Sequence, residues 1–453
     1  MNTISISIPI SISIPKTKLS SVLAEELFTP IMLSKTFVSD GRSLYPWNAQ
    51  QLYWQRIKRS EIQRVIRSLV DKEWLPYIST AVINEVVNML INDPRLYRDF
   101  DAIRKGNQHL IHVRNGVFDT KTSELITDEK FIRSCNFDYC MDFEFLEDFD
   151  AEDTPTWNKL LETSLQAESD SDKEQYVYEV LAYLLCRYTK AERAVVLYGD
   201  SGSGKSLLCN LVEGAFEARD VIAFMPTALG NKNERFKFKD TMLAVNREVP
   251  MSQISQTDVL KSLITCEMIT GEEKYQMSES FVPRCKLLMA GNTLPNFKEV
   301  DDTGNESLIR RLLVLPFKRV HDMAEADLDM KDKLIGEKNY IFSRALKYLP
   351  SLVERNFVFT ECADIKDVLA SYAELQDLLP SFVKDCCEIG EGLKVHNKDI
   401  LIAVRNYYRD NGMICQMNDN QIINRLIKLS GAVRGKFRLN GPPLSGLKNI
   451  CLK

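Results

Sequence analysis

The sequence has few of the residues that build metal centres or disulfide frameworks. Only four of its 453 residues are histidines, and its eleven cysteines, an odd number, include no Cys-x-x-Cys pair. Neither the pair Cys135 and Cys140 nor the adjacent pair Cys386 and Cys387 has the spacing of zinc ligands. These absences argue against a zinc site, and we expect reduced thiols in a cytosolic protein.

A strong excess of one charge and a long apolar run are also missing. The 58 Lys and Arg residues nearly balance 63 Asp and Glu, and the net charge of -5 gives no general attraction to nucleic acid. Any contact with nucleic acid must therefore be local. No apolar run approaches the roughly 18 residues that span a bilayer, so no membrane partner is expected. A hydrophobic content of 45% predicts a soluble protein with several packed domains.

The first third of the chain reads as a tail followed by a mostly helical domain. The opening MNTISISIPISISIP alternates Ile with Ser, but its prolines exclude a central strand, so residues 1–18 are expected to be a tail or an edge strand. Helical patterns in EIQRVIRSLVDKEWL and STAVINEVVNMLI, with a hairpin-like HLIHVRNGVFDTKTSELI, predict an N-terminal domain over residues 19–160. The acidic DFEFLEDFDAEDTPT within it is interpreted as a solvated linker rather than as a metal site formed by Asp148, Asp150 and Asp153.

Short apolar strands alternate with helices from Ala191 to about Val320, which predicts an α/β fold with a parallel sheet covered on both faces. We place this core at residues 161–325 and a helical connection at residues 326–372. Residues 373–453 read as three helices followed by a small hairpin around Gly-Pro-Pro. That order is typical of a winged helix, a variant of the helix-turn-helix.

A phosphate-binding loop is the strongest motif. AVVLY predicts a buried strand and LLCNLVEGAF a helix, so the intervening GDSGSGKS occupies the strand-to-helix turn that a P-loop requires. Backbone N–H groups and the helix N-terminus would hold phosphate oxygens, Lys205 would neutralise the β and γ phosphates, and the Ser206 hydroxyl would ligate Mg²⁺. The expected ATP-binding residues are Gly199, Asp200, Ser201, Gly202, Ser203, Gly204, Lys205, Ser206 and Leu207.

A carboxylate follows the next predicted strand of the core. TMLAVNREVP is an apolar strand that ends near Glu248, and a carboxylate at the carboxyl edge of a parallel sheet would face the phosphates. Glu248 is therefore a candidate to polarise water and to ligate Mg²⁺. The usual aspartate before this glutamate is replaced by Arg247, which weakens the argument for a metal ligand. An exposed glutamate without a role is the alternative interpretation.

An amide follows a third predicted strand. CKLLMAGNTLPNF is apolar up to Asn292, and a turn with Pro295 comes after it. A neutral amide at this edge can hold the attacking water or the γ-phosphate without competing for the proton. Asn292 is therefore a candidate catalytic residue, and an asparagine that only caps the turn is the alternative.

Two arginines precede the last predicted strand. Arg310 and Arg311 stand at the start of RRLLVLPF, after an acidic loop with Asp301 and Asp302. An arginine in this position can reach the γ-phosphate of a neighbouring subunit in a ring. A local ion pair with the two aspartates is the alternative interpretation.

In this order, the loop lysine, NREVP, ITGEEKYQ, AGNTLPNF and RRLLVLPF resemble the superfamily 3 helicases, and within them the phage, plasmid and poxvirus helicase–primase family. The resemblance extends over roughly residues 100–325. It implies an AAA+-type core assembled as a ring, usually a hexamer, with single-stranded DNA in the central channel and a neighbour's arginine at each ATP site. The TGEEKYQMSES segment corresponds to the family's channel hairpin, so Lys274 and Tyr275 become candidate DNA contacts, with an ordinary polar turn as the alternative.

The primase half of that family requires a domain with a carboxylate cluster, and the roughly one hundred residues before the matching region contain none. We therefore expect the helicase half, with a separate primase or polymerase as a candidate partner. Local positive charge in the C-terminal domain makes it a second candidate DNA site, although a solvated basic face is the alternative. The cations concerned are Arg425, Lys428, Arg434, Lys436 and Arg438.

Together these features predict an ATP- and Mg²⁺-dependent DNA helicase that replicates a mobile element or virus in the host cell cytoplasm. Its expected partners are single-stranded or forked DNA and further copies of itself. The rival hypothesis is an origin-binding initiator that uses ATP to switch its assembly state and does not unwind processively. A helicase requires Lys274 to face the bound strand, whereas an initiator requires sequence recognition by the C-terminal domain.

Overall fold

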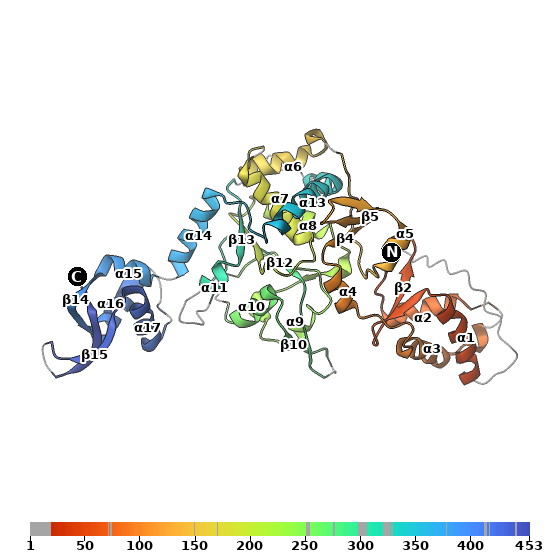
Figure 1. The fold of residues 1–453 in the computed structure, drawn as a ribbon, viewed down its shortest axis with the longest axis horizontal. Coiled ribbons are helices and arrows are strands. Elements are labelled where there is room, and N and C mark those ends of the chain that lie inside the picture. The colour runs from red at the N-terminus through yellow and green to blue at the C-terminus, as the bar shows by residue number, and fades with distance from the viewer. Residues whose placement is uncertain are drawn as a thin grey trace.

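The computed structural model describes residues 20–453 apart from 71, 73–74, 149, 170, 251–253, 275–276, 298–305, 320–326, 328, 377, 412–414, 416 and 440–441. The predicted tail over residues 1–18 lies outside the described residues. Figure 1 shows the N-terminal elements at one end of the molecule, the central sheet in the middle and the C-terminal elements at the other end. All eleven cysteines are free thiols. Among the described residues, no helix is long and apolar enough to cross a membrane.

The N-terminal elements form a small α+β unit. The two helices that the sequence predicts here occur as α2 and α3, and their apolar positions, among them Ile62, Ile66 and Val86, form one core with α1. The Ser79 hydroxyl accepts a hydrogen bond from the Val82 N–H and so caps the start of α3. The elements are α1 (Ser20–Leu33), β1 (Phe37–Ser39), β2 (Leu44–Asn48), β3 (Tyr53–Trp54), α2 (Arg59–Ser68), α3 (Thr80–Asn92) and α4 (Phe100–Gly106).

The predicted hairpin after this unit is a three-stranded antiparallel sheet, β4 (Leu110–Val113), β5 (Gly116–Asp119) and β6 (Glu124–Ile126), followed by α5 (Glu129–Ser134). The first part of the acidic stretch, residues 142–146, packs onto this sheet, which corrects the linker interpretation there, whereas Glu147, Asp148 and Asp150 are exposed as the solvated interpretation expected. Phe143 and Phe145 are buried, with Phe145 against Phe118 and Phe143 against Phe342. Over residues 142–145 the carboxylates alternate with these apolar side chains, so one side of this short part is buried and the other faces solvent.

A five-stranded parallel sheet forms the centre of the molecule, in the order β13-β7-β12-β9-β8. The predicted α/β class with a parallel sheet is therefore confirmed. Because all strands run the same way, their carboxyl ends share one edge. The strands are β7 (Ala194–Tyr198), β8 (Val221–Ala223), β9 (Leu243–Asn246), β12 (Lys286–Gly291) and β13 (Leu312–Pro316), and the connecting helices include α8 (Lys205–Glu213), α9 (Lys232–Phe236), α10 (Thr257–Thr265) and α11 (Glu306–Ile309).

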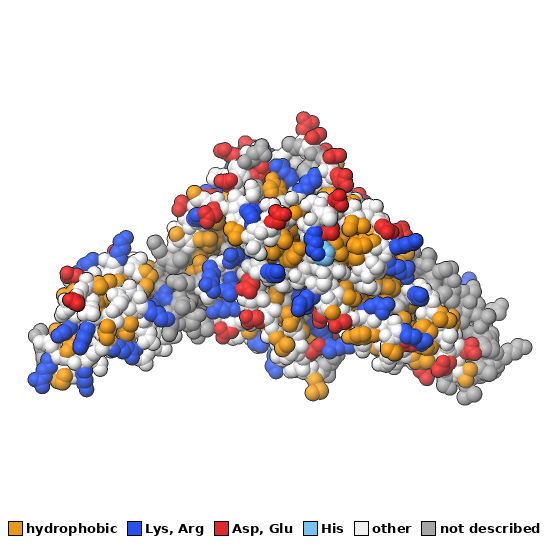
Figure 2. Space-filling model, in the orientation of Figure 1, with side chains coloured by type: hydrophobic (Ala, Val, Ile, Leu, Met, Phe, Trp, Pro, Cys, Tyr) orange, Lys and Arg blue, Asp and Glu red, His pale blue; other side chains and the backbone are white. Residues whose placement is uncertain are grey.

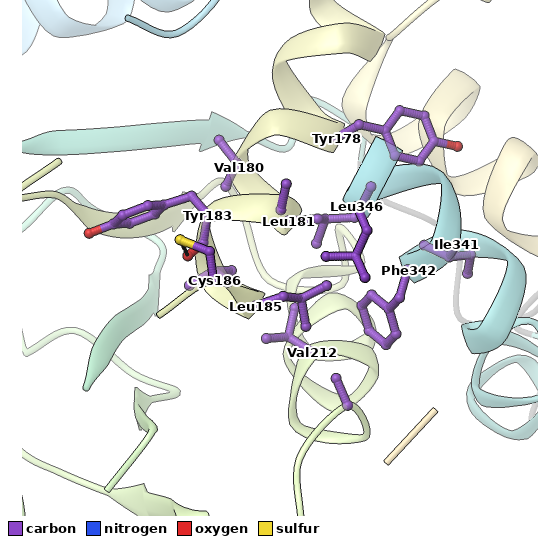
Figure 3. Packing of buried hydrophobic residues seen from close by; sticks show 14 of the residues in the cluster. Tyr178, Val180, Leu181, Tyr183, Leu185, Cys186, Val212, Ile341, Phe342 and Leu346 are labelled. Carbon is purple, nitrogen blue, oxygen red and sulfur yellow. Dashed lines mark hydrogen bonds between the residues drawn. The ribbon is translucent and has the colours of Figure 1, made fainter. Parts of the chain in front are cut away.

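Alternate side chains of each central strand enter different cores, as the period of two in a strand requires. In β7, Val195 and Leu197 belong to the core that includes α7 (Asp172–Leu185), α8 and α13 (Lys338–Glu354), whereas Val196 belongs to the core that includes α10. Figure 3 shows side chains of α7 beside Phe342 and Leu346 of α13. The remaining helices around this core are α6 (Pro155–Leu160), α12 (Met330–Gly336) and α14 (Ala363–Gln376), with a π-helical turn at Leu161–Leu165.

A buried carboxylate fastens the end of α13 to α7. Glu179 is fully buried, and its carboxylate accepts hydrogen bonds from the Arg355 guanidinium at 2.6 Å and the Gln175 side chain at 2.8 Å. The backbone N–H and the hydroxyl of Thr360 also donate to it, both at 2.7 Å. Arg355 keeps 35% of its side chain exposed, so only the carboxylate depends fully on protein donors.

We expect Glu179→Ala to lower the free energy of unfolding by about 3 kcal/mol, because half-buried donors on Thr360 and Gln175 lose a charged, fully buried acceptor. The midpoint of urea unfolding, followed by circular dichroism, measures this change. Glu361→Ala is the matched control, since Glu361 pairs with Lys366 at 2.6 Å but is 73% exposed, and it should cost less than about 1 kcal/mol. Equal midpoints for the two variants would contradict a stabilising role for the buried network.

The C-terminal unit has its own core, formed by residues between Leu378 and Ile450. The predicted helix AELQDLLPSFVKDCCEI is divided between α14 and α15, and the second of these ends at Cys386. The sequence prediction of three helices and a hairpin also missed β14, which adds a third strand in the antiparallel order β14-β16-β15. The elements are α15 (Leu379–Cys386), β14 (Cys387–His396), α16 (Asn397–Asp410), α17 (Asp419–Ser430), β15 (Val433–Phe437) and β16 (Leu444–Leu452).

Candidate functional site

The Gly-rich loop joins β7 to α8, as the sequence predicts. Gly204 is the residue before the first turn of α8, and its φ of 102° lies in the region that favours glycine. A Cβ at this position would lie 3.1 Å from Leu160 Cδ1 and 3.3 Å from Ser164 Oγ, so the turn is also closely packed from behind. The backbone N–H groups at the start of α8 point out of this turn, which makes the helix N-terminus a place for an anion.

Lys205 is the first residue of α8, and its side chain folds back across the loop. Its ammonium donates to the carbonyl oxygens of Gly199 and Asp200, both at 2.6 Å, and to Asn292 Oδ1 at 3.2 Å. Only 8% of the residue is exposed, and burial lowers the pKa of the ammonium, with the nearby Asp200 acting against this. The structure therefore joins the loop lysine directly to the asparagine at the end of β12.

Glu248 lies at the same edge of the sheet, two residues after the end of β9. It is exposed, and it lines one cavity of about 520 Å³ together with the loop and Asn292. The predicted grouping of Lys205, Glu248 and Asn292 at one edge is thus what the structure has, although their catalytic roles stay predictions. The cavity is lined by Ser201, Gly202, Ser203, Gly204, Lys205, Ser206, Leu207, Arg247, Glu248, Val249, Gly291, Asn292 and Thr293.

The polar groups that line the cavity fit a nucleoside triphosphate with a divalent cation. A cation and backbone N–H groups suit phosphate oxygens, and the Ser206 hydroxyl and the Glu248 carboxylate are oxygen ligands of the kind that Mg²⁺ prefers. Among the described residues there is no group of three or more His, Cys, Asp or Glu side chains that would hold a metal by itself. Ser206 and Glu248 would therefore hold Mg²⁺ only together with phosphate oxygens.

Sequence reasoning missed a part of this cavity, formed by Arg247, Val249, Gly291 and Thr293. Each is a neighbour in sequence of Glu248 or Asn292, so the signal was adjacency to a predicted site residue. Arg247 does not point to the loop lysine: its guanidinium donates to Asn210 Oδ1 and Glu213 Oε1 of α8, both at 2.8 Å. The residue that stands in the place of the usual aspartate is therefore engaged with the helix that follows the loop.

Arg310 and Arg311 lie at the amino ends of the strands, whereas the loop lies at their carboxyl ends. They directly precede β13, whose first residue pairs with Ala194 at the start of β7, while Pro316 pairs with Tyr198 at its end. At about 3.3 Å per residue, the length of the strand separates the arginines from the loop by roughly 13 Å. Within one chain the structure therefore does not bring them to the cavity.

The two arginines differ in their surroundings. Arg311 is half-buried, donates to the Ser307 carbonyl at 2.6 Å and pairs with Glu192 at 3.3 Å, whereas Arg310 is exposed. An ion pair of Arg311 does exist, but with Glu192; Asp301 and Asp302, the predicted partners, lie outside the described residues.

The segment predicted to be a channel hairpin forms a two-stranded antiparallel ribbon, β10 (Ile269–Gly271) and β11 (Glu279–Phe281). Lys274 is exposed in the turn between these strands, and Tyr275 lies outside the described residues. Glu279, at the start of β11, forms ion pairs with Arg42 at 2.6 Å and Lys239 at 2.8 Å. In Figure 1 the ribbon projects from the sheet, away from α6 and α7.

Four of the five predicted cations of the C-terminal unit are exposed: Lys428 on α17, Arg434 and Lys436 on β15, and Arg438 just beyond it. Arg425 is only 5% exposed, which corrects its place in the predicted basic face. It occupies the buried side of α17 together with Ile422 and Leu426. Figure 2 shows Lys and Arg side chains gathered at the end of this unit where β15 lies in Figure 1.

Comparison with known proteins relates two parts of the chain to families. Residues 32–166 match a family described as D5 N terminal like, and residues 197–311 match a family of unknown function, DUF5906. Domains of the D5 N-terminal kind occur in primase–helicase proteins of phages and viruses. The second match contains the loop, Glu248, Asn292 and both arginines. The chain is thus similar in part to phage and viral primase–helicases.

A comparison with curated proteins found no match. Among solved structures, two apo structures of the NrS-1 C-terminal region match with 16% sequence identity and TM-scores of 0.39 and 0.40. The matches cover 68% of this chain and 78% and 77% of the NrS-1 chains. At these TM-scores the likeness does not establish a common fold.

Proposed function

We propose that this protein is an ATP-driven DNA helicase of superfamily 3 that acts in the replication of a mobile element or virus. The observation that carries the proposal is the contact between the Lys205 ammonium and Asn292 Oδ1 at 3.2 Å, in a cavity that Glu248 also lines. A loop lysine, a carboxylate and an amide, each at the carboxyl end of a neighbouring parallel strand, form the group needed to hydrolyse a nucleoside triphosphate.

The strand order supports an AAA+-type core. The sheet runs β13-β7-β12-β9-β8, so the strand before the loop lies between the strand that precedes Asn292 and the strand that follows the arginines. If the five strands are numbered by their order in the sequence, their order across the sheet is 5-1-4-3-2, which is the order expected of an AAA+-type core. Such a core implies ATP and Mg²⁺, and the similarity of residues 32–166 to a domain of phage and viral primase–helicases points to DNA replication.

Each side chain then has a distinct role. Lys205 would hold the β and γ phosphates, Ser206 and Glu248 would hold Mg²⁺, and Glu248 would also accept a proton from the attacking water. Asn292 Oδ1, released from the Lys205 ammonium, would accept a hydrogen bond from the attacking water, or the Asn292 side-chain N–H₂ would donate to the γ-phosphate. Mg²⁺ supplies charge neutralisation between the phosphates when bound.

A ring explains why the arginines lie at the far edge of the sheet. In a head-to-tail ring, the edge that carries Arg310 and Arg311 in one copy can face the cavity of the next, which one chain alone does not achieve. We propose a homo-oligomeric ring, a hexamer by resemblance, that encloses single-stranded or forked DNA in the host cell cytoplasm. A primase or polymerase would be a separate partner.

Turnover of ATP by the purified protein, with and without single-stranded DNA, tests this function together with separation of a forked duplex. A helicase is expected to show stimulated turnover and ATP-dependent separation. Binding of ATP without turnover would contradict the enzyme hypothesis.

The second candidate function is an ATP-switched initiator that recognises an origin, and the C-terminal unit favours it. Its order of helix, strand, two helices and two strands supports a winged helix. Lys428, Arg434 and Lys436, exposed on α17 and β15, would form its basic recognition surface. A helicase must grip one strand in its channel, whereas an initiator reads a duplex sequence. The two functions therefore depend on different cations.

Lys274→Ala separates the two functions. We expect basal ATP turnover to stay within about twofold, because the cavity is unchanged, while DNA-stimulated turnover and strand separation fall together by at least about tenfold. The salt dependence of DNA binding should become shallower by about one phosphate contact per engaged subunit. Lys121→Ala is the matched control, another exposed lysine in the turn between two antiparallel strands, β5 and β6, and it should leave unwinding unchanged.

A different outcome would favour the initiator. If Lys274→Ala unwinds normally while removal of residues 373–453 eliminates all DNA binding, the C-terminal unit is the working DNA site. Sequence preference, measured by competition between duplexes, would then replace strand separation as the activity to follow.

A further inference from the structure

Arg247 holds the segment that carries Glu248 against the helix that follows the loop. Its Nη2 donates to both Asn210 Oδ1 and Glu213 Oε1 at 2.8 Å, and the two acceptors stand three residues apart on the same side of α8. The same helix begins with Lys205 and Ser206. One side chain therefore links the end of β9 to the element that positions the phosphate-binding groups.

The other side of Glu248 is fixed to the neighbouring strand. The Val249 N–H donates to the Ala290 carbonyl of β12 at 2.8 Å, and Val249 is buried. Gly291 makes this approach possible, since a Cβ there would lie only 2.8 Å from Val249 Cβ and from the Thr293 carbonyl oxygen. Glu248 is thus held between two anchors, one on α8 and one on β12.

We propose that Arg247 is a positioning residue that sets the place of the Glu248 carboxylate relative to the loop. This inference rests on the proposed ATP hydrolysis. An aspartate in this position would carry negative charge into the cavity, whereas Arg247 directs its charge to Glu213. Of the residues that the structure describes around the cavity, Glu248 is then the only one with an acidic side chain. Both bonds come from Nη2, whose two N–H groups have fixed directions in the guanidinium plane, unlike the rotatable donors of an ammonium.

The two hydrogen bonds from Arg247 to Asn210 and Glu213 form a brace between the end of β9 and α8, and this brace affects the geometry of the site more than the stability of the fold. The Arg247 side chain is 45% exposed and that of Glu213 is 27% exposed, and exposed ion pairs contribute little to folding. A carboxylate that accepts a proton from water must stay within hydrogen-bond reach of it, and a displacement of about 1 Å can cost about 100-fold in rate. Loss of the brace should therefore appear in kcat.

We expect Arg247→Ala to lower kcat for ATP by about 10- to 100-fold, with KM for ATP changed less than about threefold. Arg247→Lys should recover part of kcat, because the ammonium keeps the charge but its donors rotate on a flexible stem and do not have the fixed directions of the guanidinium N–H groups. Glu213→Gln keeps an oxygen acceptor and should cost less than Arg247→Ala. The thermal unfolding midpoint should remain within about 2 °C for all three variants.

Epistasis with Glu248 is the decisive measurement. Glu248→Gln alone is expected to lower kcat strongly, and adding Arg247→Ala to it should cause no further loss, because the brace then has no catalytic carboxylate to position. A further full loss in the double variant would show that Arg247 acts independently of Glu248 and would overturn the proposal.

Lys237→Ala is the matched control. It breaks an ion pair with Glu234 at 2.6 Å whose partners are 49% and 33% exposed, but the pair lies outside the residues that line the cavity, so kcat should not change. If Arg247→Ala instead raises KM for ATP at unchanged kcat, Arg247 is a nucleotide-binding cation and the positioning role is wrong. Should the wild-type protein lack ATP turnover that depends on Lys205, the proposed function itself fails; normal turnover in Arg247→Ala removes only this inference.

Discussion

Lys205→Ala is expected to abolish ATP hydrolysis and strand separation. Among the described residues, the Lys205 ammonium is the one lysine charge that lines the cavity, and it lies between the loop carbonyls and Asn292 Oδ1, where phosphate oxygens would replace those acceptors. We expect kcat to fall at least about 100-fold, since Arg247, the other cation among the described residues that line the cavity, is engaged by Glu213 and does not replace the lost charge on the β and γ phosphates. Steady-state phosphate release, with and without single-stranded DNA, measures the change.

The fold should survive this substitution, because the Lys205 side chain packs on loop carbonyls and not in an apolar core. Circular dichroism and the unfolding midpoint check that point. Lys366→Ala, which removes a 60% exposed lysine paired with Glu361, is the matched control and should hydrolyse ATP normally. Near-normal ATP turnover by Lys205→Ala would contradict the assignment of the loop as the nucleotide site.

Much of the candidate site could be predicted because it depends on local order. A strand, a Gly-rich turn and a helix place Lys205 at the carboxyl edge of a parallel sheet, and further apolar strands deliver Glu248 and Asn292 to the same edge. The strand partners need not be known for that inference. The contact between Lys205 and Asn292 Oδ1 at 3.2 Å shows that two of these side chains do meet at that edge.

Features that depend on distant partners could not be predicted. CEIGEGLKVH has little apolar alternation, and it becomes β14 because β16, more than fifty residues later, pairs with it. Arg425 looked like part of a basic face because its charge was read without the orientation of α17. Likewise, the family match begins at residue 32, well before the resemblance seen from motifs near residue 100, because the early helices carry packing residues and no chemical motif.

Arg310→Ala is expected to lower ATP turnover by about 1,000-fold if Arg310 completes the site of a neighbouring copy, the range known for arginines supplied in trans. Arg310 is the stronger candidate because it is exposed, while the Arg311 guanidinium is engaged by the Ser307 carbonyl and Glu192. Arg311→Ala is the matched control because it removes the adjacent arginine. It should lower the unfolding midpoint, whereas ATP turnover should fall much less than in Arg310→Ala.

Mixing two inactive variants tests the action in trans. Arg310→Ala subunits keep Lys205, and Lys205→Ala subunits keep Arg310, so in an equal mixture about a quarter of head-to-tail interfaces combine both intact groups. Turnover should therefore recover to roughly a quarter of the wild-type value if the sites act independently. Exchange of fluorescently labelled subunits verifies that mixed rings form. No recovery in rings shown to be mixed would mean that Arg310 acts within its own chain or is purely structural. Because about 13 Å of strand separates Arg310 from the loop of its own chain, only the structural explanation would then remain.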